Sequence, residues 1–178
     1  MLKPQDIMIL LKIVAMQQRE WKYSEAALEL AMSPSEVHSG VKRLKKCMLL
    51  TEFSIDTGAS VYKRHLPDTK ALKEFMRYGL SHVFPAQLTG VARGIPTSYG
   101  FANLFEGFAY DSSFIPVWEY QSGEYNGVGL KPLYPSAPQA AVNDFTLYEM
   151  LALTDALRSG DRLLQNTAWQ KFQTLIGE

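Results

Sequence analysis

Apolar residues recur along much of the chain at intervals of three and four, the spacing that places them on one side of an α-helix. In residues 5–18 this stripe predicts a helix with one buried face. The same pattern predicts a helix over residues 69–83 and two further helices over residues 144–158 and 161–176. Helices are therefore expected at both ends of the chain and in its middle.

Two short helices are predicted between the first helix and residue 50. The first covers residues 25–31, with Ser24 as its N-cap. The second begins at Ser33-Pro34-Ser35-Glu36. In this tetrapeptide Ser33 and Glu36 form a capping box, and Pro34 occupies the first helical position. Only two residues separate these helices. The residues expected to point inward from the second helix are Val37, Val41, Leu44 and Met48.

Period-two alternation predicts strands in two places. Residues 51–65 are expected to form a hairpin around residues 56–59, where Gly58 can adopt a positive φ. Residues 117–120 and 125–130 are expected to form a second hairpin. Residues 85–140 are otherwise irregular, rich in proline and aromatic residues, and too aromatic to be disordered.

A long helix, two short helices and a hairpin, in that order, are typical of a winged helix-turn-helix. Residues 2–66 resemble this domain in bacterial regulators of the MarR-like type. The resemblance rests on residues 24–33 and then on Val37, Val41, Lys42, Arg43 and Leu44. It implies that the second short helix enters the DNA major groove while the first braces it. It also implies a homodimer.

The outward face of that second helix supplies the candidate DNA-binding residues. Base edges are expected to be contacted by Ser35, His38, Ser39 and Lys42, and phosphates by Arg43, Lys45 and Lys46. Lys63 and Arg64 are expected to be cations of the wing. Gly40 costs such a helix about 1 kcal/mol relative to alanine. We therefore expect it either to pack closely on the first helix or to approach DNA.

Composition narrows the class of protein. The 178 residues carry 18 Lys+Arg and 18 Asp+Glu, which excludes a globally basic, histone-like chain. Residues 1–83 nevertheless hold 13 basic and 9 acidic residues, a net of +4, and the remainder has a net of −4. The only cysteine, Cys47, excludes an internal disulfide and is expected to be a small packed residue. Neither an export signal nor a membrane span is recognisable, so the expected location is the cytoplasm.

Catalytic motifs are absent from the sequence. It contains no His-Glu-x-x-His, no Gly-x-Ser-x-Gly and no Gly-x-x-x-x-Gly-Lys, and its three histidines are scattered. We therefore expect no enzyme activity, no cofactor and no metal site. The aromatic residues of the middle segment are expected to form core, or else an apolar effector pocket or a protein-binding surface. They are Tyr99, Phe101, Phe105, Phe108, Tyr110, Phe114, Trp118, Tyr120, Tyr125 and Tyr134.

The resulting prediction is an α+β protein. It comprises a winged helix-turn-helix over residues 1–67, a linker helix over residues 68–84, and a small α+β region over residues 85–178 that ends in two helices. The predicted function is transcriptional regulation by sequence-specific binding to double-stranded DNA. The alternative is a protein-interaction module, an antitoxin-like partner that uses the winged helix as a docking surface.

Overall fold

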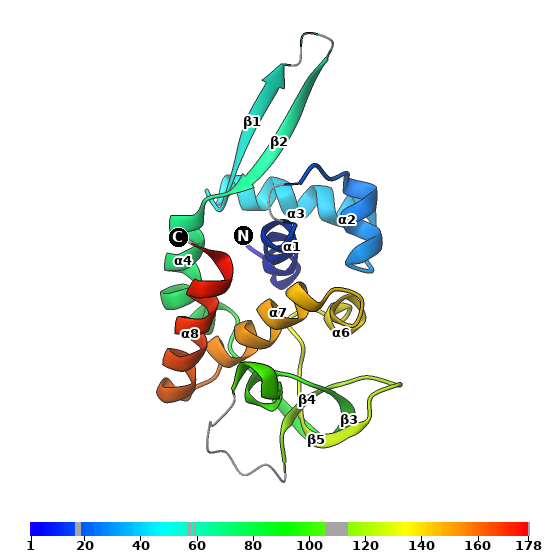
Figure 1. Ribbon diagram of the computed structural model, residues 1–178, viewed down its shortest axis with the longest axis vertical. Coiled ribbons are helices and arrows are strands. Elements are labelled where there is room, and N and C mark those ends of the chain that lie inside the picture. Colours follow the sequence, from blue (N-terminus) through cyan, green and yellow to red (C-terminus); the bar gives the residue numbers. More distant parts are fainter. Residues whose placement is uncertain (17–18, 57, 59, 106–113, 178) are drawn as a thin grey trace.

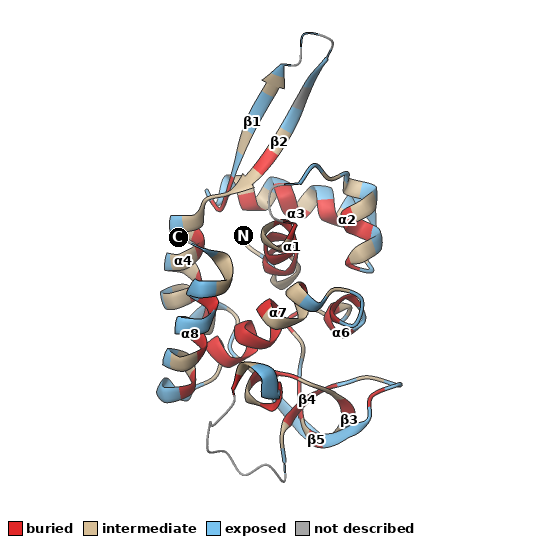
Figure 2. Cartoon of the chain, in the orientation of Figure 1, coloured by how far each residue is buried: buried red, intermediate tan, exposed pale blue. Residues whose placement is uncertain are grey.

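Helix α7 (Phe145–Leu157) lies at the centre of the computed structural model, which describes residues 1–16, 19–56, 58, 60–105 and 114–177 (Figure 1). Every residue from Met150 to Leu157 is buried. The reason is that α7 is covered from several directions by α1 (Pro4–Ala15), α6 (Ala137–Ala141) and α8 (Arg162–Ile176). Figure 2 shows this burial along the helix. The two helices predicted at the C-terminus are confirmed as α7 and α8, whereas helix α6 was not predicted.

Helix α1 is buried on more than one side. All residues from Asp6 to Ile13 are buried, because α3 (Pro34–Lys46) packs on one side of α1 and α7 on another. The prediction of a single buried face is therefore wrong for this helix. The charged residues within the buried stretch, Asp6 and Lys12, are both ion-paired.

The first hairpin extends away from the body of the molecule (Figure 1). Strands β1 (Leu50–Asp56) and β2 (Val61–Pro67) pair antiparallel along their whole length, from Leu50 opposite Pro67 to Asp56 opposite Val61. Gly58 has a φ of 78°, and its N–H donates a 2.8 Å hydrogen bond to the Asp56 carboxylate. The predicted hairpin is confirmed and is slightly longer than expected. Residues 57 and 59 of the predicted turn lie outside the described residues.

The helix predicted over residues 69–83 is continuous but not uniform. It begins as α4 (Thr69–Glu74), widens into the π-helical turn η1 (Phe75–Gly79) and ends as α5 (Leu80–Val83). The Asp68 carboxylate caps it by accepting a 2.9 Å hydrogen bond from the Ala71 N–H. Its buried residues are Leu72, Met76 and Leu80.

The second predicted hairpin is wrong. Strands β4 (Pro116–Glu119) and β5 (Tyr125–Leu130) run parallel to each other, and each pairs antiparallel with β3 (Leu88–Pro96), a strand that the sequence did not indicate. Glycines allow the close approach of these strands. A Cβ on Gly94 would lie 1.6 Å from the Trp118 carbonyl oxygen, and one on Gly127 would lie 2.0 Å from that of Ile115. Two 3₁₀ turns, η2 (Ser98–Gly100) and η3 (Ala102–Leu104), follow β3.

One hydrophobic core extends through all three predicted parts of the chain. It contains Ile7 and Leu44 from the N-terminal part, Met76 from the middle helix, and Met150 and Phe172 from the C-terminal part. The described residues thus form an α+β fold, with helices packed around a shared core and two small sheets. Within the part of the chain that is described, no helix combines the length and apolar character needed to cross a bilayer.

Candidate nucleic-acid interface

Helix α3 starts at the capping box that the sequence predicts. The Glu36 N–H donates to the Ser33 hydroxyl oxygen at 3.2 Å, and the Ser33 N–H donates to the Glu36 carboxylate at 2.9 Å. Pro34 occupies the first helical position. Hydrogen bonds from Ser33 lower the pKa of the Glu36 carboxyl, which therefore stays charged at the positive end of the helix dipole.

The C-terminal part of the chain supports the start of α3. The Tyr134 hydroxyl donates a 2.8 Å hydrogen bond to the second oxygen of Glu36. The Ser136 hydroxyl donates a 2.7 Å bond to the carbonyl of Leu30, at the end of α2 (Tyr23–Glu29). Both ends of the α2–α3 turn are therefore held by one short segment before α6. The N-cap of α2 is Lys22, so the prediction that Ser24 caps this helix is wrong.

The two faces of α3 divide largely as predicted. Val37, Val41 and Leu44 are buried, and Gly40 is buried against α1. A Cβ on Gly40 would lie 2.4 Å from Cδ1 of Ile9, so close packing on α1 explains this glycine. The exposed or half-buried residues of the other face include Ser35, His38, Ser39, Lys42, Lys45 and Lys46.

The end of α3 differs from the prediction. Met48 is 75% exposed rather than inward, and Cys47 is exposed rather than packed. The helix ends at Lys46, and Met48 adopts a φ of 58° just beyond it. The N–H of Leu49 then bonds back to the Leu44 carbonyl at 3.0 Å, a Schellman motif that turns Leu49 rather than Met48 into the core.

A cleft of about 740 Å³ lies between α3, the β1–β2 hairpin, the segment 19–22 that precedes α2, and the first residue of α2, Tyr23. It brings together five of the candidate DNA-binding residues from two elements. His38, Lys42 and Lys45 come from α3, and Lys63 and Arg64 come from β2. Further cations and aromatic residues that sequence reasoning missed line the same cleft: Arg19, Trp21, Lys22, Tyr23 and His65.

Arg43 belongs to the opposite side of α3. Its Nε and Nη2 atoms donate to the two oxygens of Asp6 at 2.8 and 2.6 Å, and the Asp6 side chain is completely buried. The hydrogen bonds from Arg43 to Asp6 raise the pKa of the guanidinium further, so Arg43 stays charged. This geometry gives Arg43 a role in joining α3 to α1.

The cations of the cleft differ in how they are paired. Lys45 and Lys63 both contact the Glu52 carboxylate, Lys63 at 2.8 Å. Hydrogen bonds from these two lysines lower the pKa of Glu52 to about 2. By contrast, the described residues provide no carboxylate within ion-pair distance of Lys22 or Lys42, and the same holds for Lys46 beside the cleft.

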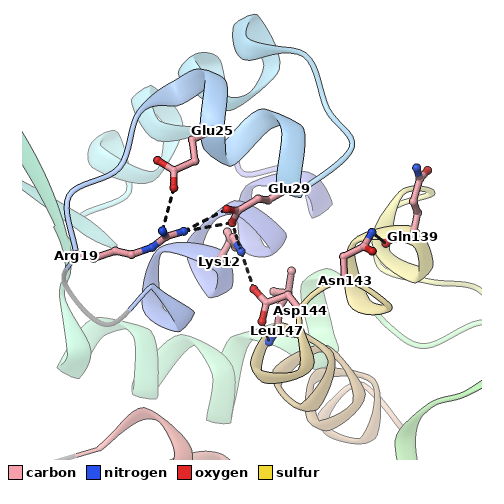
Figure 3. Close-up of polar contacts among 8 residues, drawn as sticks. All are labelled: Lys12, Arg19, Glu25, Glu29, Gln139, Asn143, Asp144 and Leu147. Carbon is pink, nitrogen blue, oxygen red and sulfur yellow. Dashed lines mark hydrogen bonds and ion pairs between the residues drawn. The ribbon is translucent and has the colours of Figure 1, made fainter.

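Arg19 is held by carboxylates of α2. Figure 3 shows its guanidinium directed at Glu25 and Glu29, with N–O distances of 2.9 and 3.2 Å. Glu29 also contacts Lys12 of α1, which bonds the Asp144 carboxylate at 2.6 Å. Asp144 in turn caps α7 by accepting from the Leu147 N–H at 3.0 Å. This charged cluster fixes α2 relative to α1 and α7.

Aromatic rings form one wall of the cleft. The Tyr23 ring meets the His38 ring edge-on at 5.2 Å between centroids and lies 5.3 Å from the Trp21 ring. The Tyr23 hydroxyl lies 2.9 Å from Nε2 of His65. His65 is only 8% exposed, and burial lowers its pKa, so it is neutral at pH 7. Its other ring nitrogen, Nδ1, is 3.8 Å from Glu52.

The described aromatic residues of the middle segment pack mainly as core. Phe101 and Tyr148 lie 4.4 Å apart between ring centroids, and Trp118 is 5.6 Å from Tyr148. The Trp118 indole N–H donates a 2.6 Å hydrogen bond to Asp155, whose carboxylate also binds Arg158 at 2.7 Å. Phe114 and Tyr125 are exposed, whereas Phe108 and Tyr110 lie outside the described residues.

Comparisons with known proteins found no match for this chain, whether among protein-family models, curated protein sequences or solved structures.

Proposed function

We propose that this protein is a sequence-specific regulator of transcription that binds double-stranded DNA through a winged helix-turn-helix. In this proposal α2 and α3 are the helix-turn-helix, the β1–β2 hairpin is the wing, and α3 enters the major groove. The protein acts by occluding or positioning the transcription machinery at its site.

A single observation carries the proposal. Cations from α3, from β2 and from the segment before α2 line one cleft, although they are separated by more than forty positions in the sequence, from Lys22 to Arg64. Duplex DNA carries one negative charge per roughly 1.7 Å of its axis, so a cationic cleft beside an exposed helix suits its backbone. A helix about 10–12 Å wide fits the major groove of B-DNA.

In this proposal some solvent-facing residues of α3 contact bases and others contact phosphates. Ser35, His38 and Ser39 occupy its N-terminal half, the part of a recognition helix that reaches base edges, and Lys42 follows one turn after His38 on the same face. Lys45 and Lys46, at its C-terminal end, are placed for phosphates, as are Lys63 and Arg64 of the hairpin. Arg43 takes no part in this division, because its guanidinium is bonded to Asp6.

We further propose that the protein binds as a homodimer to a pseudo-palindromic site. The two recognition helices would then lie one helical turn, about 34 Å, apart. With about four phosphate-contacting cations in each protomer, the logarithm of the binding constant should fall with log salt at a slope of roughly −7.

The test is retention of sheared source-genome DNA on the purified full-length protein, sequenced at low and at near-physiological salt. The proposal predicts a few retained fragments that share an inverted repeat and survive the higher salt. Retention at neither salt would overturn it and favour docking of a protein partner. Uniform retention that disappears at the higher salt would overturn sequence specificity.

A matched pair of double variants separates the proposed interface from general charge. Lys42→Ala with Lys46→Ala removes two exposed cations from α3, whereas Lys70→Ala with Lys171→Ala removes two exposed cations from α4 and α8. Both change the net charge equally. Only the α3 pair should abolish specific retention.

A further inference from the structure

Glu52 lies at the junction of the two elements that supply most of the cleft's cations. On the hairpin it pairs with His65, and Lys63 lies two positions before His65 on the same face of β2. This diagonal relationship brings the Lys63 ammonium to 2.8 Å from one Glu52 oxygen. Lys45 reaches the other oxygen from α3. A single carboxylate therefore bridges α3 and the hairpin.

Stability of the fold gives little reason for this arrangement. The Lys63 side chain is 66% exposed and that of Lys45 is 35% exposed. Ion pairs this close to solvent contribute little to the free energy of unfolding, because water and salt screen them. The hairpin is already paired along its full length through its backbone.

The arrangement has a larger effect on anion binding. Lysine ammonium groups that already hold a carboxylate neutralise fewer phosphates, so fewer of the counterions condensed on the DNA are released when the protein binds. The carboxylate also repels any phosphate that approaches the same two lysines.

We propose that Glu52 is an internal competitor for the DNA phosphate that Lys45 and Lys63 contact. This inference rests on the proposed function, and it adds to it a residue that weakens the interface. DNA has to displace the carboxylate before the two lysines can hold the backbone, so Glu52 lowers affinity for all sequences alike. Discrimination then depends more on the contacts of α3 with bases, because the non-specific part of the affinity is reduced.

The experiment compares the full-length protein with its Glu52→Gln variant. The probe is a labelled mixed-sequence DNA duplex of about 30 base pairs, roughly three helical turns, titrated at several salt concentrations. We expect Glu52→Gln to bind about tenfold more tightly at low salt and to steepen the salt slope by about 1–2 per protomer, because each released lysine adds about 0.9.

Glu20→Gln is the matched control. Glu20 lines the same cleft and is exposed, and the described residues offer it no lysine or arginine partner. The two variants change the net charge identically. If Glu20→Gln raised the affinity for DNA as much as Glu52→Gln does, the proposal would be overturned, because the effect would then come from total charge.

A double-variant cycle tests the specific link to lysine. Glu52→Gln should raise the affinity for DNA less than half as much in a protein whose Lys45 and Lys63 are both replaced by alanine as it does in the wild type. Glu52→Thr, which suits a β-strand, serves as a second variant if the glutamine protein is poorly folded. Unchanged affinity in both Glu52 variants, with wild-type protein that does bind DNA, overturns this inference alone. Failure of every variant and of the wild type to bind DNA overturns the proposed function as well.

Discussion

Arg43 and Asp6 form a two-bonded ion pair between α3 and α1, with the Asp6 carboxylate completely buried and the Arg43 side chain 23% exposed. One Asp6 oxygen also accepts the Lys3 N–H at 2.8 Å, at the start of α1. The pair therefore fixes α3 on α1 at the position where Gly40 allows the two helices to approach closely.

Arg43→Ala should lower the free energy of unfolding by about 3 kcal/mol, because it leaves the Asp6 carboxylate buried without its partner. Urea denaturation measures this directly. Lys46→Ala, three residues further along the same helix and exposed, should change stability by less than about 0.5 kcal/mol. Equal effects of the two substitutions would contradict the assigned role of Arg43.

Gly40 and Ile9 should be energetically coupled. Gly40→Ala would gain about 1 kcal/mol of helix propensity but would place a Cβ 2.4 Å from Ile9 Cδ1, an overpacking that costs about 1–3 kcal/mol. We expect a net loss of about 1 kcal/mol. In an Ile9→Val protein the obstructing methyl group is absent, so the same substitution should be neutral or stabilising. Denaturation of the four proteins of the cycle measures the coupling, and an equal loss in both backgrounds would rule it out.

Local signals explain most of what the sequence predicted. The capping box of α3 and the β1–β2 hairpin depend on residues close together in the chain, and both are confirmed. The parallel pairing of β4 with β5 depends on β3, whose nine residues follow no alternation of buried and exposed positions. Its first four residues are all exposed, so the strand lacks the alternation of buried and exposed positions that would have predicted it.

The cleft was predictable only in part. The basic face of α3 and the cations of the hairpin are visible in the sequence, but the segment 19–22 has no helical or strand pattern that would place it beside them. Arg43 resembles its neighbours Lys42 and Lys45 in sequence, and its partner Asp6 lies 37 residues away. Glu52 and His65 could have been predicted as residues of the cleft. In an antiparallel hairpin, period-two alternation places them on the same face as Lys63.

His65 should make the protein less stable in mild acid. Burial lowers its pKa below the ordinary value of 6.5, so the unfolded chain binds a proton there more readily than the folded chain does. The contribution of neutral His65 to stability is complete above pH 6.5 and is lost as pH falls through its folded-state pKa. The nearby Glu52 opposes this shift, whereas Lys45, Lys63 and His38 reinforce it.

Urea denaturation between pH 5 and 8 measures this effect as the difference between wild type and His65→Gln, which keeps a hydrogen-bonding group near Tyr23. The wild type should lose stability relative to the variant as the pH falls below 6.5. Parallel profiles would show that protonation of His65 is not coupled to folding.

Lys42 and Lys63 should affect DNA binding in different ways. Lys42 is exposed on α3, one turn after His38, whereas Lys63 lies on the hairpin in contact with Glu52. Loss of a base contact lowers affinity only for sequences that carry the matching base, by about 1–3 kcal/mol, and loss of a phosphate contact weakens all sequences and reduces the salt slope by about 1.

Selection from a randomised duplex library, followed by titration of the best and a scrambled sequence, distinguishes these outcomes. Lys42→Ala should lower the ratio of the two affinities about tenfold, and Lys63→Ala should leave that ratio unchanged while weakening both. Equal and uniform losses from the two variants would refute the division of roles between helix and hairpin.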